Sequence, residues 1–93
     1  QLIENNNFKL KIIHTPGHSP GSSCFLFNEL YLFTGDTLFS GSIGRTDLPL
    51  SSTAEMRKSL KKIVNLPINT KLYPGHGPKS TLEKELNNNP YLI

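Results

Sequence analysis

His14-Thr-Pro-Gly-His18-Ser-Pro-Gly21 is the stretch of this 93-residue chain that decides its fold and its chemistry. It follows an apolar segment and places two imidazoles in turns built around Pro-Gly pairs. Thr34-Gly-Asp36-Thr-Leu-Phe39 and Tyr73-Pro-Gly-His76-Gly-Pro78 likewise put a polar side chain in a glycine-bearing turn after an apolar segment. Such turns hold side chains rigidly at a sheet edge, where nitrogen and oxygen atoms can bind a metal ion together. The three turns therefore predict a metal site that combines histidine with Asp36.

Hydrophobic periodicity around these turns predicts a mixed α/β chain with elements in the order β, β, β, α, β, α. Four short segments are apolar in alternation or in a continuous run, and we expect them to be strands: 8–13, 23–28, 30–34 and 70–73. The pair Asn28-Glu29 suits a hairpin turn between the second and third strands. The glycine-rich segment from Gly35 to Pro49 has no period and predicts a long loop, of the kind that usually carries function.

Two capping boxes predict the helices. In Ser52-Thr-Ala-Glu55, Ser52 is the expected N-cap of an amphipathic helix of about three turns that buries Met56 in the core. In Ser80-Thr-Leu-Glu83, Ser80 is the expected N-cap of a short last helix. Pro67 ends the first helical segment, because its ring cannot continue a helix.

The composition indicates a small domain that needs support from outside its own core. Hydrophobic residues make up 35% of the chain, against about 45–50% in typical domains when glycine is counted. A domain of this size is marginal without a metal, a partner or further sequence. The net charge is +3, and four of the ten basic residues cluster over 57–62, which is typical of a solvated helix face. We expect no nucleic-acid partner, because aromatic residues are not interleaved with this charge.

The single cysteine, Cys24, lies in an apolar run and cannot form an internal disulfide. This favours a reducing, cytoplasmic setting and a role for Cys24 as a core residue. Nothing approaches the roughly 20 apolar residues of a membrane span, so no membrane partner is expected. The chain opens at Gln1 and not at Met. We therefore expect the true start of the protein to lie upstream.

The sequence resembles the second half of a metallo-β-lactamase-fold hydrolase, and within that superfamily the glyoxalase II (hydroxyacylglutathione hydrolase) branch. The three turn motifs and Gly44-Arg-Thr-Asp47 carry the resemblance, in family order, over residues 8–91. The ending from Gly77 to Thr81, followed by Asn89-Pro90, resembles short bacterial-type enzymes without a separate glutathione-binding helical domain. The resemblance implies an α/β (α+β) fold that is half of an αββα sandwich. Residues 1–93 would be its C-terminal half, with one sheet and the helices that cover it.

The resemblance also implies which residues bind metal. His18 matches a ligand of the first metal ion, Asp36 matches the bridging carboxylate of the catalytic centre, and His76 matches a ligand of the second ion. The implied cofactor is Zn²⁺, as one or two ions, with iron or manganese as alternatives. His14 matches a position that is not a ligand, and we expect it to be structural, hydrogen-bonded near the site.

Arg45 matches a position where relatives carry a basic residue toward the substrate carboxylate, a group that arginine binds in bidentate fashion. An ion pair with Asp47 or Glu55 is an equal alternative for the same side chain. Asp47 could instead orient a metal ligand or cap a helix.

Members of the family also carry an upstream His-x-His-x-Asp-His motif that supplies the remaining metal ligands. The chain has three histidines in all, at 14, 18 and 76, so this motif is absent from it. We expect that the N-terminal half of the domain, with the motif, is missing. Alone, the chain is expected to be inactive and prone to aggregate through the face that the missing half would cover.

For the intact protein, the resemblance implies a metal-dependent hydrolase of a small-molecule thioester, such as a glutathione conjugate, that uses metal-bound hydroxide. A thiolate leaves readily because a free thiol has a pKa of about 8.5, so little general-acid help is needed. Two alternatives remain: a mononuclear iron persulfide dioxygenase, whose branch shares the Gly44–Asp47 segment, and a non-catalytic, truncated metal-binding module.

Overall fold

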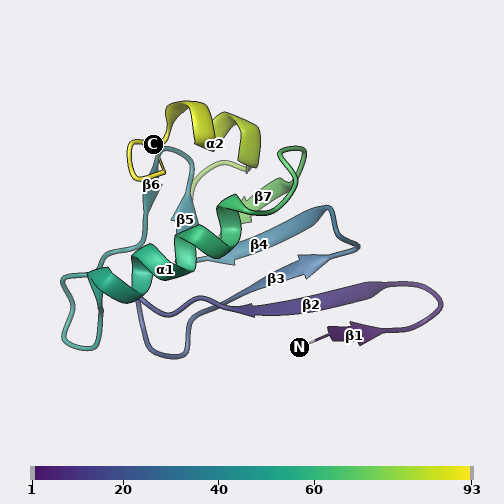
Figure 1. Ribbon diagram of the computed structural model, residues 1–93, viewed down its shortest axis with the longest axis horizontal. Coiled ribbons are helices and arrows are strands. Elements are labelled where there is room, and N and C mark those ends of the chain that lie inside the picture. The colour runs from purple at the N-terminus through teal and green to yellow at the C-terminus, as the bar shows by residue number, and fades with distance from the viewer. Residues whose placement is uncertain (1, 93) are drawn as a thin grey trace.

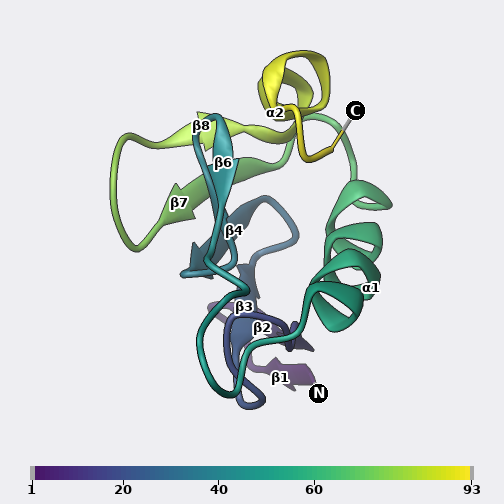
Figure 2. The same ribbon diagram turned by 90° about the vertical axis from the view of Figure 1, so that its left-hand side faces the viewer.

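The computed structural model describes residues 2–92, which form a six-stranded sheet with both helices on one of its faces (Figures 1 and 2). The strand order is β1-β2-β3-β4-β7-β8. The strands of this sheet are β1 Leu2–Glu4, β2 Lys9–His14, β3 Ser23–Phe27, β4 Tyr31–Gly35, β7 Lys71–Pro74 and β8 Ser80–Thr81. Two short strands, β5 Leu38–Phe39 and β6 Ser42–Ile43, form a separate hairpin. The helices are α1 Thr53–Val64 and α2 Leu82–Asn88.

Neighbouring strands of the large sheet are antiparallel except for β4 and β7, which run parallel. Parallel neighbours need a crossover connection, and here α1 lies in that connection and packs back on the sheet. The mixed α/β class predicted from the sequence is confirmed.

The predicted hairpin turn at Asn28-Glu29 is confirmed by its backbone. Both residues have positive φ, 52° and 59°, as a type I′ turn requires. The N–H of Leu30 donates to the carbonyl of Phe27 across the turn at 3.2 Å. The turn thereby fixes the register of β3 against β4.

Three strand regions were not predicted: β1, the β5–β6 hairpin and β8. Residues 2–4 pair with β2 as the edge strand β1, although all three are exposed and show no alternating burial. The predicted long loop from Gly35 to Pro49 contains the β5–β6 hairpin, so that prediction was wrong in part. Its tight turn includes Gly41 with a φ of +78°, a left-handed conformation that glycine adopts without strain.

The predicted N-cap of the first helix is confirmed, although the Ser52 N–H donates to Gly17 and not to the Glu55 side chain; the N-cap of the second helix is shifted by one residue. Ser52 is the N-cap of α1, and its Oγ accepts a hydrogen bond from the N–H of Glu55 at 3.1 Å. The prediction that Ser80 caps the last helix was wrong, because Thr81 is the N-cap of α2. Ser80 is held in β8, and its hydroxyl donates to the Glu85 carboxylate instead.

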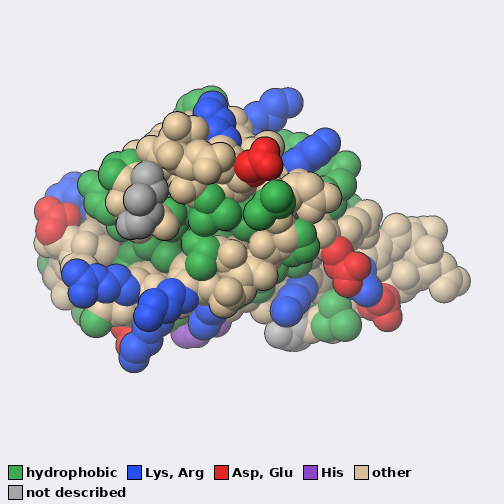
Figure 3. Space-filling model, turned by 45° about the horizontal axis from the view of Figure 1, so that its top comes forward, with side chains coloured by type: hydrophobic (Ala, Val, Ile, Leu, Met, Phe, Trp, Pro, Cys, Tyr) green, Lys and Arg blue, Asp and Glu red, His purple; other side chains and the backbone are tan. Residues whose placement is uncertain are grey.

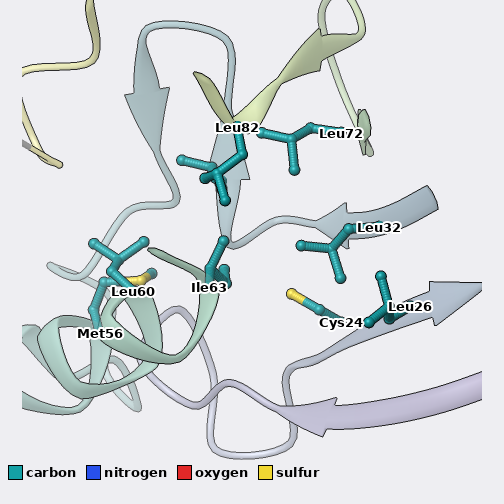
Figure 4. Packing of buried hydrophobic residues seen from close by; sticks show 9 residues of the cluster. Cys24, Leu26, Leu32, Met56, Leu60, Ile63, Leu72 and Leu82 are labelled. Carbon is teal, nitrogen blue, oxygen red and sulfur yellow. The ribbon is translucent and has the colours of Figure 1, made fainter. Parts of the chain in front are cut away.

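The hydrophobic core lies between the sheet and the helices (Figure 4). The sheet contributes Cys24, Leu26, Leu32 and Leu72; α1 contributes Met56, Leu60 and Ile63; Leu38 and Leu82 complete the cluster. The expected core roles of Met56 and Cys24 are confirmed, since both are buried. Burial also raises the pKa of the Cys24 thiol, which keeps it protonated and unreactive at neutral pH.

The opposite face of the sheet has no helix over it (Figure 2) and carries exposed aromatic side chains. Phe25 pairs with Phe33 across β3 and β4, and Phe33 pairs with Tyr73 across β4 and β7. The rings of Phe33 and Tyr73 stack with centroids 5.3 Å apart. Phe25 and Phe33 remain 40% and 45% exposed. An uncovered aromatic row of this kind marks a surface that is normally buried against another element.

Charged groups are scattered over the helix-bearing surface. In Figure 3 the Lys and Arg side chains lie in several separate places around a central apolar area. Within residues 2–92, no helix combines the length and the apolar character needed to cross a membrane.

Candidate metal centre

The turn that follows β2 is held in place by side chains of α1. The Oγ of the buried Ser59 donates to the carbonyl of Pro16 at 2.6 Å. Lys62 Nζ donates to the carbonyl of His14 at 2.7 Å. These bonds tie the carbonyl at the end of β2 and a carbonyl of the turn to α1, so the helix helps to determine where the turn lies.

Gly17 is needed for this close approach. Its φ is +148°, and a Cβ at this position would lie 2.6 Å from the Cα of Met56. The carbonyl of Gly17 also accepts from the N–H of Ser52 at 2.7 Å. The backbone of the turn therefore rests directly on the first turn of α1.

The three predicted ligands meet at Asp36. His18 Nε2 lies 3.9 Å from Asp36 Oδ2, and His76 Nε2 lies 3.5 Å from Asp36 Oδ1. Each carboxylate oxygen thus faces a different imidazole, as expected for a carboxylate between two cations. Within residues 2–92, however, no group of three or more His, Cys, Asp or Glu side chains is arranged to hold a metal ion by itself. Among the described residues, His18, Asp36 and His76 therefore do not make up a complete metal site.

Main-chain contacts orient His18. Its Nδ1 lies 3.0 Å from the carbonyl oxygen of Arg45. A carbonyl only accepts hydrogen bonds, so Nδ1 carries a proton, and Nε2 is the ring nitrogen on the side of Asp36. Ser51 Oγ donates to the carbonyl of His18 at 2.7 Å and approaches that of Arg45 at 3.5 Å. The segment before α1 therefore fixes the orientation of this ligand.

Two glycines allow the turns to interlock around Asp36. A Cβ at Gly44 would lie 1.8 Å from the carbonyl oxygen of Asp36 and 3.3 Å from the Cβ of His18. A Cβ at Gly75 would lie 3.1 Å from the carbonyl oxygen of Gly35, to which the Gly75 N–H donates at 2.8 Å. The backbones of the ligand-bearing segments touch, which leaves no room for side chains at these positions.

His76 is held far less firmly than His18. Its side chain is 81% exposed, against 24% for His18. The ring of Phe39, in β5, lies beside it with centroids 6.1 Å apart. Sequence reasoning missed Ser51, and it gave no role to Phe39 and Gly44 although both lie in the quoted motifs, since a hydroxyl, an aromatic residue and a glycine carry no ligand signature of their own.

His14 and Arg45 lie at the margin of the centre. His14 Nε2 is 2.9 Å from the carbonyl of Pro20, the kind of structural hydrogen bond expected for it. Arg45 forms a bidentate pair with Asp47, at 3.0 Å and 3.1 Å. Hydrogen bonding in this pair raises the pKa of Arg45 and lowers the pKa of Asp47. Of the two ion pairs considered for Arg45, the one with Asp47 forms, whereas Glu55 lies 3.8 Å from Lys58.

A family model and individual relatives point to the same protein family. The sequence model of the metallo-beta-lactamase superfamily matches residues 1–76. A probable metallo-hydrolase of Streptococcus pyogenes is 41% identical over 93 residues, which are 98% of this chain and 40% of that protein. A hydroxyacylglutathione hydrolase of Haemophilus influenzae is 36% identical over 94 residues, with 99% and 44% covered. The chain thus spans less than half the length of these relatives.

Solved structures agree in fold. The BLEG-1 B3 metallo-beta-lactamase has a TM-score of 0.90 and 42% identity, over 98% of this chain and 44% of that one. The structure of TTHA1623 in a di-iron-bound form has a TM-score of 0.84 and 41% identity, over 97% of this chain and 45% of that one.

Proposed function

Since the chain belongs to the metallo-β-lactamase superfamily, we propose that it supplies part of a dinuclear metal centre to a metal-dependent hydrolase. One observation carries the proposal: the Asp36 carboxylate lies between Nε2 of His18 and Nε2 of His76, with one oxygen toward each. His18 and Asp36 would bind one ion, and Asp36 and His76 the other.

The chemistry of the donor set fits such ions. Two imidazole nitrogens and a carboxylate suit zinc and iron, and the main-chain bond at Nδ1 leaves Nε2 of His18 free to bind. The di-iron-bound form of TTHA1623 supports iron as an alternative to zinc. Ions bound by these residues would lower the pKa of water and polarise the substrate carbonyl.

We further propose that residues 1–93 are the C-terminal half of the domain and that an upstream half provides the remaining ligands. A zinc ion needs about four ligands, so three residues shared by two ions leave each shell open. The uncovered row of Phe25, Phe33 and Tyr73 supports this proposal, because it offers an apolar face for a second sheet. The relatives, of which the chain covers 40% and 44%, support it as well.

The proposed reaction is hydrolysis of a thioester such as an acyl-glutathione, a substrate class suggested by the name of the Haemophilus influenzae relative. Asp36 holds its two oxygens toward the two imidazoles, and the Arg45 carbonyl holds the His18 tautomer. The exposed Arg45 guanidinium would exchange Asp47 for a carboxylate of the substrate. The thiolate product leaves without a dedicated acid. We place this chemistry in the cytoplasm, where a lone buried thiol such as Cys24 stays reduced.

The test is an assay of the full-length protein with S-lactoylglutathione, before and after chelation and after zinc or iron is added back. We expect activity to vanish with the metal and to return with it. Activity that is indifferent to chelation would sink the proposal. Hydrolysis of other esters with none of the thioester would keep the metal centre and reject the substrate class.

A second candidate is a mononuclear iron persulfide dioxygenase, whose branch shares the Gly44–Asp47 segment. Metal analysis together with oxygen uptake on glutathione persulfide separates the two. A third, the non-catalytic module, is tested by titrating zinc into the 93-residue chain. We expect the chain to bind at most one zinc ion, and weakly. Tight binding of two ions would contradict the argument that three ligands leave both coordination shells incomplete.

A further inference from the structure

Glu85 is a buried carboxylate outside the ligand set. It lies in α2 and is 1% exposed. The Gly41 N–H donates to its Oε1 at 2.8 Å, and Asn89 Nδ2 donates to the same oxygen at 3.0 Å. The Ser80 hydroxyl donates to Oε2 at 2.5 Å. A carboxylate is rarely buried without partners, and here three donors compensate for its lost hydration.

The charge of Glu85 is retained at neutral pH. Burial raises its pKa, but the hydrogen bonds from Ser80, Gly41 and Asn89 outweigh burial and bring the pKa below its ordinary value. Hydrogen bonds to an ionised acceptor are about twice as strong as those between neutral groups. The group therefore acts as a strong, fixed acceptor.

Asn89 extends the same network to both strands of the β5–β6 hairpin. Its Nδ2 lies 3.3 Å from the carbonyl of Phe39 and 3.1 Å from that of Ser42. Figures 1 and 2 show the hairpin beside α2 in both views. The hairpin is thus attached to the helix at its turn, through Gly41, and on either side of that turn.

This network joins the two segments that follow the metal ligands. The hairpin comes directly after the Asp36 turn, and Phe39 within it lies against the His76 ring. Ser80 lies in β8, on the far side of the His76 turn. Because Glu85 binds both Gly41 and Ser80, it ties the segment after Asp36 to the segment after His76.

We propose that Glu85 is a positioning residue for the metal centre: it holds the β5–β6 hairpin, and with it Phe39, at the distance that places His76 against Asp36. The inference rests on the proposed metal function. It gives the weakly held ligand His76 a support that is remote from the ions, as Ser51 and the Arg45 carbonyl support His18.

The experiment measures zinc affinity in the full-length protein by chelator competition, well below the unfolding temperature, for Glu85→Ala, Glu85→Gln and Glu83→Ala. Glu85→Gln keeps an acceptor for the Gly41 N–H, and the exposed Glu83 on the same helix serves as the matched control. We expect Glu85→Ala to lower the affinity for one of the two zinc ions by about tenfold. This is the lower end of the effect that outer-shell partners of metal ligands have. Glu85→Gln should keep most of the wild-type zinc affinity, and Glu83→Ala should leave the zinc affinity unchanged.

Hydrogen exchange at the Gly41 amide supplies the readout that does not depend on metal. We expect faster exchange in Glu85→Ala and near-normal exchange in Glu85→Gln. Should Glu85→Ala fail to fold, Ser80→Ala removes a single donor, and we expect a loss of roughly threefold in zinc affinity. Unchanged affinity in the alanine variants, with wild-type protein binding zinc, overturns the inference alone. Wild-type protein that binds no metal overturns the proposed function and this inference with it.

Discussion

The two histidine turns of the centre are built in different ways. His18 is mostly enclosed: a main-chain carbonyl binds its Nδ1, and Ser51 binds its backbone. His76 projects from a turn between β7 and β8, is 81% exposed, and has the ring of Phe39 beside it. The chain therefore preorganises one ligand, while the other depends on contacts from outside its own turn. Preorganised ligands bind metal at a lower entropic cost, so the two ions should differ in affinity.

Asp36 is the residue that the two turns share, and its removal should have the largest effect. We expect Asp36→Ala to lower kcat/KM for the thioester by roughly 10³-fold, equivalent to about 4 kcal/mol, because both ions lose a ligand. Metal content measured alongside should fall for both ions. The control is His14→Gln, at the end of β2 just before the turn that holds His18, with its side chain bonded to the Pro20 carbonyl. We expect its kcat/KM to fall by less than about tenfold, because one hydrogen bond is lost. Full metal content in Asp36→Ala would refute the bridging role.

Gly44 and Gly75 test how tightly each turn is packed. The Gly44→Ala methyl would meet the Asp36 carbonyl at 1.8 Å, whereas the Gly75→Ala methyl would meet the Gly35 carbonyl at 3.1 Å. We expect Gly44→Ala to destabilise the full-length protein by about 3 kcal/mol and Gly75→Ala by about 1 kcal/mol, within the range for overpacking. Denaturant unfolding measures both. Gly21→Ala is the matched control, because a Cβ there meets nothing within 4 Å. Equal losses of stability in Gly44→Ala and Gly75→Ala would show that the two turns are packed equally tightly.

Ser51 tests whether main-chain support matters for one ion only. Ser51→Ala removes the hydroxyl that binds the carbonyls of His18 and Arg45. We expect one of two zinc affinities to fall by about tenfold, and the other to stay unchanged, when titration is followed by calorimetry. Thr53→Ala, which loses a hydrogen bond to Thr46 nearby, should leave both affinities as they are. An equal fall in the affinity for both zinc ions in Ser51→Ala would mean that the two metal positions are coupled and do not respond separately.

The sequence predicted the elements whose signals are local and failed where distant contacts decide. Alternation located β2, and the Ser52 capping box located the start of α1, because both patterns reside within a few residues. The β5–β6 hairpin has two residues in each strand and is held by Glu85 and Asn89, more than forty positions away. Short strands of this kind have no period to detect.

The same division applies to the centre. The ligand types and their turns could be predicted, because Pro and Gly mark the turns and imidazole and carboxylate mark the chemistry. The support of His18 could not, since a backbone carbonyl is present at every residue and the identity of Arg45 does not reveal its use. Gly44 was visible as the first residue of the Gly44–Asp47 motif, but the reason for a glycine there is the close contact with Asp36, which only the fold creates.

Arg45 separates support of His18 from recognition of substrate, because its backbone and side chain have different partners. The backbone carbonyl binds His18, whereas the guanidinium binds Asp47 and is exposed. Arg45→Ala should therefore leave zinc affinity unchanged, while KM for S-lactoylglutathione rises by about fivefold, a modest effect because exposed ion pairs are weak. Asp47→Asn frees the guanidinium and should lower KM slightly. Loss of zinc in Arg45→Ala would show that the side chain, too, supports His18, and the two turns would then differ in more than their main-chain contacts.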